Sequence, residues 1–378
     1  MDKKRMAQLR KRGFLFWLSR KIDYPLMSPD CLQINFTFSC NLMCKMCSMH
    51  ERLQSFKSAN RRHEIEVDVM KKLIKEAVKM RIGSLILIGG EPFLEPRLLE
   101  LVNFARESGI EGITVVTNGT LFNESVIKNI FDLNLDNLNF SISIDAATEK
   151  TFAQIRGENA LGKIIENVNL INSIKEKENK IYPNICSVCT IMDQNLEELM
   201  DIVKLCRKIK ISRLIFQPVV GDNTDQRRRD RDSSVFVSKD RHVILDNAIN
   251  DLIKYKMQSR DNFDYIANSV KHLQLINSYF KGKRLSPREM PCYAGYNRLQ
   301  IVQEGKVYFC VNQENHEATY GDVGKDSLKA LWFSSKARFY RKLIRKCNFP
   351  CLQWCSYRDD FNELSGELQK NKLFKNNV

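Results

Sequence analysis

The chain has 378 residues, a formal net charge of +15 at pH 7, and fractions of hydrophobic (43%) and aromatic (9%) residues that are ordinary for a soluble protein. No stretch is long enough to span a bilayer, and the apolar run 14–18 is too short for a secretory signal, which argues against integral membrane and disulfide-stabilised secreted proteins. We therefore expect a cytoplasmic protein, in which the twelve cysteines more often bind metal than form disulfides.

The excess of basic residues begins in an N-terminal extension, residues 1–27, where Arg10, Lys11 and Arg12 precede the apolar run 14–18. We favour a plain extension that packs on the following domain, with peripheral contact to a membrane surface as the alternative. Most of the remaining charge is interpreted as solvated helix faces. We expect no nucleic-acid partner, because nothing resembles a recognition helix or a platform of stacked aromatic side chains.

Residues 28–220 alternate short β-rich segments with helical patterns. The expected strands are rich in Ile, Val, Leu and Phe and span Leu32–Phe38, Ser84–Ile88, Gly112–Thr117, Asn137–Ile144, Asn184–Ile191 and Arg213–Gln217. The expected helices between them span 66–81, 95–109, 122–133, 161–177 and 196–209. Six such repeats with right-handed crossovers predict an α/β fold, a partial (β/α)6 TIM-like barrel, whose chemistry gathers at the C-terminal ends of the strands.

Three cysteines, Cys40, Cys44 and Cys47, follow the first expected strand in a C-x3-C-x2-C pattern. A [4Fe–4S] cluster usually takes four thiolate ligands, so a trio leaves one iron open to a ligand that is not protein. An amine and a carboxylate on one small molecule can chelate that iron, and S-adenosylmethionine carries both. A structural zinc site completed by His50 is the alternative, and we favour the cluster.

The second expected strand ends in Gly89-Gly90-Glu91-Pro92. Two glycines lack Cβ atoms, so a ligand can approach the backbone closely. The carbonyl groups and the Glu91 carboxylate are acceptors suited to a cationic amino group. Taken alone, the segment is also consistent with a tight turn before a helix.

Further polar residues follow the later strands. Asn118 lies in a turn after the third strand, Ser143 lies near the end of the fourth, and Gln217 ends the sixth. Arg156 follows the fourth strand and can bind a cofactor carboxylate through charge-assisted hydrogen bonds, with a surface arginine as the alternative. The fifth strand contains a C-x2-C pair, Cys186 and Cys189, which should point to opposite faces; with Cys206 they are interpreted as core thiols.

Residues 221–285 are expected to form a polar linker followed by a helical segment, and residues 286–378 a small C-terminal domain. A hairpin is expected over Leu299–Val311, turning at Glu304-Gly305. The domain has five cysteines, and the first two frame a C-x12-G-x4-C pattern: Cys292, Cys310, Cys347, Cys351 and Cys355. A zinc ribbon is the alternative to an iron–sulfur centre for this group.

Together these motifs resemble those of the radical S-adenosylmethionine (radical SAM) superfamily. The cysteine trio is similar to its CxxxCxxC motif and residues 89–92 to its GGEP motif. The resemblance implies that Cys40, Cys44 and Cys47 bind a [4Fe–4S] cluster. It also implies that Gly89, Gly90, Glu91, Pro92, Ser143 and Arg156 contact S-adenosylmethionine. Asn118 and Gln217, which end strands at the same mouth, are expected to contribute to this site. The C-terminal pattern resembles SPASM/twitch extensions, and its five cysteines, against seven in a full SPASM domain, favour a twitch-like domain with one auxiliary [4Fe–4S] cluster.

The resemblance further implies an enzyme that cleaves S-adenosylmethionine reductively and uses the 5′-deoxyadenosyl radical to abstract hydrogen from its substrate. An electron donor of the flavodoxin or ferredoxin type is required. We favour oxidation or rearrangement of a small polar, carbohydrate-like substrate, with modification of a ribosomal peptide as the alternative. A non-catalytic iron–sulfur or zinc protein that senses redox state or binds nucleic acid is the alternative from another class.

Overall fold

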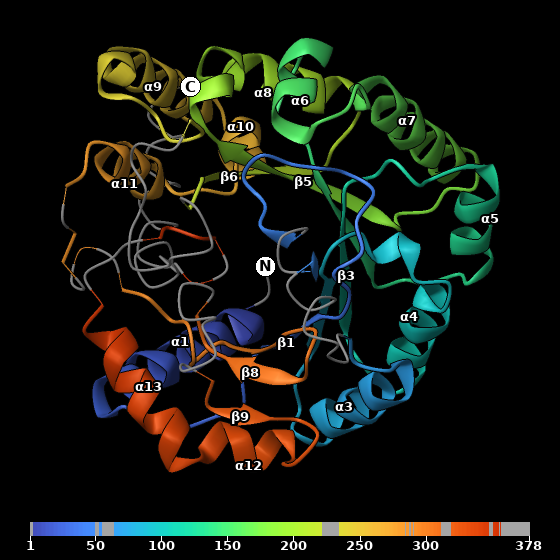
Figure 1. The fold of residues 1–378 in the computed structure, drawn as a ribbon, viewed down its shortest axis with the longest axis vertical. Coiled ribbons are helices and arrows are strands. Elements are labelled where there is room, and N and C mark those ends of the chain that lie inside the picture. The colour runs from blue at the N-terminus through green and yellow to red at the C-terminus, as the bar shows by residue number, and fades with distance from the viewer. Residues whose placement is uncertain are drawn as a thin grey trace.

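The computed structural model describes residues 3–49, 53–54, 64–220, 234–283, 285–286, 289, 291–310, 319–347, 351–354 and 356, with the side chains of the first helix described from Lys11 onward. Helices surround a strongly curved sheet whose strands line the interior (Figure 1). Among the described residues, none of the helices has the length and apolar character that crossing a bilayer requires.

Six parallel strands form the barrel wall. They are β1 Cys31–Asn35, β2 Ser84–Ile88, β3 Gly112–Thr117, β4 Leu138–Ser143, β5 Asn184–Ile191 and β6 Arg213–Pro218. The outer helices are α3 Val67–Lys79, α4 Leu98–Glu107, α5 Glu124–Asp132, α6 Glu149–Arg156, α7 Leu161–Lys177 and α8 Leu199–Lys208. Each strand pairs in parallel with the next, in the order β1 to β6, which confirms the predicted partial barrel.

Two details differ from the sequence prediction. The first strand ends at Asn35 rather than Phe38: the Phe36 N–H still donates to Ile88 O at 2.9 Å, but residues 36–38 are irregular. Helix α6 was not predicted; Thr148 caps it by accepting from Thr151 N, and Gly157 ends it with a φ of +86°. This helix places Arg156 on a regular element rather than in a surface loop.

The cysteines of the fifth repeat pack as predicted. Burial alternates along β5, so Cys189 is fully buried while Cys186 lies on the other face and donates to Phe140 O at 3.5 Å. Cys206 on α8 is fully buried. Burial raises the pKa of Cys206 to about 12, so this thiol remains protonated and apolar in character.

The C-terminal region extends the barrel sheet instead of forming a separate sheet. Strand β7, Arg298–Ile301, pairs in parallel with β1, and β8, Lys306–Tyr308, and β9, Gly321–Asp322, follow in antiparallel fashion. The predicted hairpin is confirmed through β8, with Gly305 at a φ of +78°; Val311 lies outside the described residues. The two cysteine-bearing regions therefore share one sheet.

The remaining helices are α1 Lys3–Ile22, the 3-10 turn η1 Pro92–Leu94, the turn η2 Asp193–Glu198, the turn η3 Lys239–Arg241, α9 His242–Gln258, α10 Arg260–Tyr265, α11 Val270–Phe280, α12 Leu328–Phe333 and α13 Ser335–Arg345. Helices α9 to α11 confirm the predicted helical segment, whereas residues 221–233 of the linker lie outside the described residues. Within the N-terminal extension, Arg12 forms an ion pair with Asp30 of the predicted barrel domain, and Phe16 is buried with Tyr293 and Tyr296 of the C-terminal region.

Candidate functional site

The C-terminal ends of the six parallel strands meet at one mouth of the barrel, and the loop that carries Cys40, Cys44 and Cys47 lies there after β1. This cysteine loop, residues 40–47, is held between three neighbours: the turn after β2, the turn after β3 and the end of α6. Most of these contacts come from residues other than the cysteines, and one is made by Cys44.

The two glycines after β2 make room for the backbone that leads into the cysteine loop. A Cβ on Gly89 would lie 2.5 Å from Thr37 O, and one on Gly90 would lie 2.0 Å from Ser39 O, distances that no side chain tolerates. The same approach forms two hydrogen bonds, Gly90 N to Thr37 O and Glu91 N to Ser39 O, each 2.7 Å long. The glycines thus position the cysteines, a role that the sequence analysis did not assign to them.

Glu91 is completely buried and binds the turn after β3. Its carboxylate accepts from Thr117 Oγ1 at 2.6 Å, from Asn118 N at 2.7 Å and from Phe93 N at 3.1 Å. Burial raises the pKa of Glu91, and these donors only partly offset it. Since three protein donors already engage the carboxylate, Glu91 ties β2 to β3, and its predicted contact with a cofactor amino group stays a prediction. Pro92, which is buried, begins the turn η1.

Asn118 connects the turn after β3 with the cysteine loop. Its Nδ2 donates to Asn41 Oδ1 at 2.9 Å, and Asn41 Nδ2 in turn donates to Thr120 Oγ1 at 2.8 Å. Asn41 lies directly after Cys40, so these two side-chain hydrogen bonds fix the start of the loop. Sequence reasoning missed Asn41 and Thr120, although their side-chain amide and hydroxyl groups flank motifs that it had singled out.

The third neighbour of the loop is the end of α6. Arg156 Nη1 donates to Cys44 Sγ at 3.6 Å and Nη2 forms an ion pair with the fully buried Asp145. Burial opposes the charged guanidinium, but Asp145 and Cys44 outweigh it and raise the pKa of Arg156. Gly157 completes this side, because a Cβ there would lie 3.0 Å from Met43 O. A permanent cation therefore contacts a thiol that the sequence analysis identified as a cluster ligand.

These features fit a bound anionic cluster. Burial is the largest influence that raises the pKa of Cys40, and the nearby Cys44, Glu91 and Cys47 raise it further. The Cys40 thiolate therefore requires a compensating positive charge such as iron. Arg156 Nε is buried without a hydrogen-bond partner among the described residues and remains available to a ligand. In the described part of the chain, no three Cys, His, Asp or Glu side chains converge as a single ion would need. A cluster differs, because each thiolate binds its own iron.

Ser143 and Gln217, at the ends of β4 and β6, are partly buried at the same mouth.

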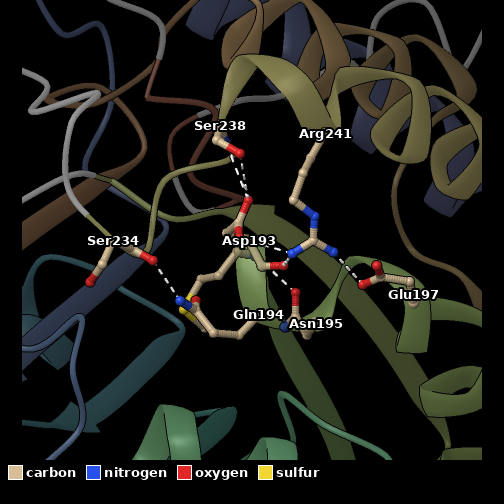
Figure 2. Close-up of polar contacts among 8 residues, drawn as sticks. Asp193, Gln194, Asn195, Glu197, Ser234, Ser238 and Arg241 are labelled. Carbon is tan, nitrogen blue, oxygen red and sulfur yellow. Dashed lines mark hydrogen bonds and ion pairs between the residues drawn. The ribbon is translucent and has the colours of Figure 1, made fainter.

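Beside β5, the chain that returns after residue 233 is fastened to the turn η2. Figure 2 shows Arg241 between Asp193 and Glu197, with Arg241 Nη1 2.9 Å from both Asp193 Oδ2 and Asp193 O. Ser238 N adds a bond to Asp193 Oδ1 at 3.2 Å.

A second group of cysteines lies in the C-terminal region. Burial raises the pKa of the Cys292 thiol, and electrostatic interactions with Cys351 and Cys347 raise it further. Cys310 follows β8 and is partly buried. Cys355 lies outside the described residues, although Tyr293 N donates to its neighbour Ser356 O at 2.9 Å.

A buried histidine links this second group to the barrel. His272 on α11 is fully buried, and its Nε2 lies 3.0 Å from Leu352 O, next to Cys351. Its Nδ1 lies 3.1 Å from Asn268 Nδ2. Asn268 also bonds both Phe216 N and Phe216 O of β6, at 2.7 and 2.6 Å. Because a carbonyl only accepts and an amide NH2 only donates, His272 is neutral with its proton on Nε2.

Comparisons with known proteins agree with both cysteine groups. A model of the radical SAM superfamily matches residues 34–206, and a model of the SPASM iron–sulfur cluster-binding domain matches residues 292–357. The chain is 21% identical over 346 residues to the tungsten-containing aldehyde ferredoxin oxidoreductase cofactor-modifying protein of Pyrococcus furiosus, covering 87% of each chain. It is 24% identical over 357 residues to the GTP 3′,8-cyclase of Aquifex aeolicus, covering 93% of this chain and 96% of the other.

Two solved structures share the fold. Streptococcus suis SuiB bound to precursor peptide SuiA has a TM-score of 0.64 at 15% identity, covering 88% of this chain and 74% of SuiB. Native anSMEcpe with bound AdoMet and Cp18Cys peptide has a TM-score of 0.60 at 18% identity, covering 92% of this chain and 98% of the other. At these identities the similarity establishes the fold alone.

Proposed function

The chain belongs to the radical SAM superfamily and carries a C-terminal SPASM iron–sulfur domain, and from this premise we propose that it abstracts hydrogen from a small polar, carbohydrate-like substrate in an oxidation or rearrangement. The contact between Arg156 and Cys44 Sγ carries the proposal, because it places a permanent cation on a thiol of the CxxxCxxC motif. When bound, the [4Fe–4S] cluster and S-adenosylmethionine together supply a one-electron cleavage that releases methionine and a hydrogen-abstracting 5′-deoxyadenosyl radical.

The residues of this chain hold and orient that machinery. Cys40, Cys44 and Cys47 would bind three irons, on a loop that Gly89, Gly90 and Asn118 fix before any metal binds. The guanidinium of Arg156 stabilises the Cys44 thiolate electrostatically and, through a hydrogen bond to sulfur, is expected to raise the cluster potential. Ser143, Gln217 and the free edge of Arg156 are the proposed contacts with S-adenosylmethionine.

We propose one auxiliary [4Fe–4S] cluster in the SPASM domain. Cys292 interacts electrostatically with Cys347 and Cys351; we propose these three as ligands, and either Cys310 or Cys355 would complete four. This cluster either accepts the electron of the substrate radical or positions the substrate. A flavodoxin- or ferredoxin-type protein is the proposed electron donor, and a reducing cytoplasm the proposed location. We propose an N-terminal extension over 1–27, a barrel domain over 28–220, a linker and helical segment over 221–285 and a SPASM domain over 286–378. Strand β7 of the last region joins the barrel sheet.

A ribosomal peptide is the second candidate substrate. The observation that favours it is the shared fold with SuiB and anSMEcpe, both solved with peptides, across about nine tenths of this chain. The names of the curated relatives include GTP 3′,8-cyclases, which act on a small polar molecule and agree with the first candidate.

The proposal is tested by anaerobic reconstitution with iron and sulfide, iron counting, and dithionite-driven cleavage of S-adenosylmethionine. We expect about eight irons and formation of 5′-deoxyadenosine in the wild type, and about four irons with no 5′-deoxyadenosine in a Cys40→Ala/Cys44→Ala/Cys47→Ala variant. A matched Cys186→Ala/Cys189→Ala/Cys206→Ala variant should retain all the iron. Zinc in place of iron, or a fully loaded protein that forms no 5′-deoxyadenosine, would move the sensor or nucleic-acid-binding alternative forward.

A further inference from the structure

Large apolar side chains in the described part of the chain are exposed mainly at one place. Of twelve such side chains, seven lie in two segments: Phe14, Trp17, Ile22, Tyr24 and Leu26 in and after α1, and Phe339 and Leu343 on α13. All four aromatic residues among the twelve are in this set. Isolated exposed apolar residues are normal, whereas a concentration of this kind marks an interaction surface.

The two segments belong to one edge of the molecule. Asp23, directly after α1, accepts two hydrogen bonds from Arg345 of α13, at 2.7 and 2.8 Å. The rings of Tyr24 and Phe333 lie 6.1 Å apart, and Trp332 Nε1 donates to Met27 O at 3.0 Å. Figure 1 shows α1 and α13 together at the lower left. We call the seven apolar residues, with the exposed lysines Lys21, Lys342 and Lys346, the aromatic–basic face.

The spacing of these residues gives each helix one outward face. On α1, Phe14, Trp17 and Lys21 follow the i, i+3, i+7 pattern and point away from the buried Phe16 and Ser19. The rings of Phe14 and Trp17 stack with centroids 5.8 Å apart, and Lys21 Nζ lies 5.6 Å from the Trp17 ring.

On α13, Phe339 and Leu343 are one turn apart, between Arg338, Lys342 and Lys346, which are exposed. The opposite face of the helix is buried through Ala337, Tyr340, Arg341 and Ile344.

The charge of this surface has one sign. Asp23 is the only acidic residue within residues 11–27 and 334–347, and it is buried and paired with Arg345. Trp, Tyr and Phe side chains beside lysines, without acidic neighbours, are the composition of surfaces that lie in the headgroup region of anionic bilayers. A bilayer accepts side chains projecting from two separate elements without requiring a shaped partner.

We propose that the aromatic–basic face docks the protein on an anionic lipid bilayer surface. The apolar rings enter the boundary between headgroups and acyl chains, while the lysines contact lipid phosphates. The proposal is independent of the catalytic function, because none of these residues contacts the cysteine loop in a recorded interaction. Surface docking agrees with the absence of a spanning helix among the described residues.

The test is co-sedimentation of the reconstituted full-length protein with vesicles of phosphatidylcholine alone or with about one third phosphatidylglycerol. We expect at least tenfold stronger partition onto the anionic vesicles, weakened by salt because surface charges are screened. In a Phe14→Ser/Trp17→Ser/Phe339→Ser/Leu343→Ser variant, partition onto the anionic vesicles should fall about tenfold or more. In a Lys21→Glu/Lys342→Glu/Lys346→Glu variant it should fall by a similar factor. Cleavage of S-adenosylmethionine in solution should be unchanged in both, which shows that they fold.

Matched controls remove the same chemistry elsewhere. Ile181 and Val243 are 77% and 69% exposed, more than any apolar residue of the face, so Ile181→Ser/Val243→Ser controls for lost surface hydrophobicity. Lys128→Glu/Lys163→Glu/Lys177→Glu on α5 and α7 makes the same change in net charge. Equal loss in the controls, or wild type left in solution with anionic vesicles at low salt, overturns the proposal. The proposal is also overturned if vesicles do not bind and the face variants instead lose binding to an acidic carrier protein or to a second copy of this chain.

Discussion

The two cysteine-bearing regions of this protein are held in different ways. The cysteine loop at the barrel mouth is fastened on three sides by groups that are not cysteines: the backbone of Gly90 and Glu91, the amides of Asn41 and Asn118, and Arg156. Contacts at the C-terminal cysteines reach the backbone beside them from distant parts of the chain: Arg20 Nε donates to Cys292 O at 3.1 Å, and His272 Nε2 lies 3.0 Å from Leu352 O.

This difference indicates how each site meets its metal. A loop fixed by hydrogen bonds and close backbone packing keeps its shape without iron, so cluster binding there costs little ordering. The C-terminal cysteines are spread over residues 292–355, so we expect more of the binding free energy of their cluster to be coupled to folding. Four substitutions, taken from the largest expected effect to the smallest, test this contrast.

The ion pair at the barrel mouth is the first test. Arg156→Met leaves the fully buried Asp145 carboxylate without its cation, so we expect the free energy of unfolding to fall by about 3–5 kcal/mol. Arg156→Met/Asp145→Asn should recover most of this loss, because Asn retains an oxygen to accept from Thr190 N, 2.7 Å away. Urea unfolding of the iron-free full-length protein measures both. A loss below about 1 kcal/mol would show that the mouth is not preorganised.

The histidine link is the second test, because it acts on the C-terminal region. His272→Leu removes the donor to the Leu352 carbonyl and the acceptor of one Asn268 N–H in a buried site, and we expect a loss of about 2–3 kcal/mol. Iron retention should fall in the C-terminal site and not at the mouth. We would count iron in the background of the Cys40/Cys44/Cys47→Ala variant, in which only the C-terminal cluster contributes.

The matched substitution His272→Gln places an amide donor near the position of Nε2 and should preserve more of the C-terminal iron. Its electron paramagnetic resonance spectrum should then resemble that of the unsubstituted background. Equal iron loss in the Leu and Gln variants would mean that the hydrogen bond to Leu352 O has no part in positioning Cys351.

Glu91 gives a third test through pH. Because burial raises its pKa, the folded state holds the Glu91 proton more tightly than the unfolded state does. Stability from this group is therefore greatest below the unfolded pKa of about 4.3 and falls as pH rises toward the higher folded value. Glu91→Gln cannot titrate, so the advantage of the wild type over this variant should shrink with rising pH, to about 1 kcal/mol near neutrality.

Stability curves of the two iron-free proteins, measured between about pH 4 and pH 8, isolate this single group because all other titrations are shared. An advantage that grows with pH would mean that the three donors to the carboxylate outweigh its burial, and that the anion is the form the fold prefers.

Much of the fold follows from local sequence signals, whereas the contacts that build the site do not. The strands were predictable from runs such as Ser84–Ile88, and the trio Cys40, Cys44 and Cys47 from its spacing. Gly89 and Gly90 leave room for the backbone of Thr37 and Ser39, which lie about fifty residues earlier in the chain. This role depends on which segment the fold places against the glycines. Sequence patterns do not encode such partners.

The same limit applies to the longest-range contacts. Nothing in the short segment Arg298–Ile301 indicates that it adds to the edge of β1 in parallel, some 270 residues earlier in the chain. His272 and Asp145 were passed over because a lone histidine or aspartate has no local signature; only their buried partners reveal them. The C-terminal domain was expected to be twitch-like, and it matches the model of the broader SPASM domain. The number of cysteines shows how many ligands are available but not how clusters share them.

The smallest expected effect concerns the contact that joins the two regions. Gln303 follows β7, is fully buried, and donates from Nε2 to Thr37 O at 3.1 Å, directly before the cysteine loop. Gln303→Met removes this hydrogen bond but also a buried Oε1 that has no partner among the described residues, so we expect a loss of about 1 kcal/mol or less. Calorimetry should still show one unfolding transition, because the four residue pairs between β1 and β7 remain. Two separate transitions would mean that the regions cooperate through this side chain and not through their common sheet.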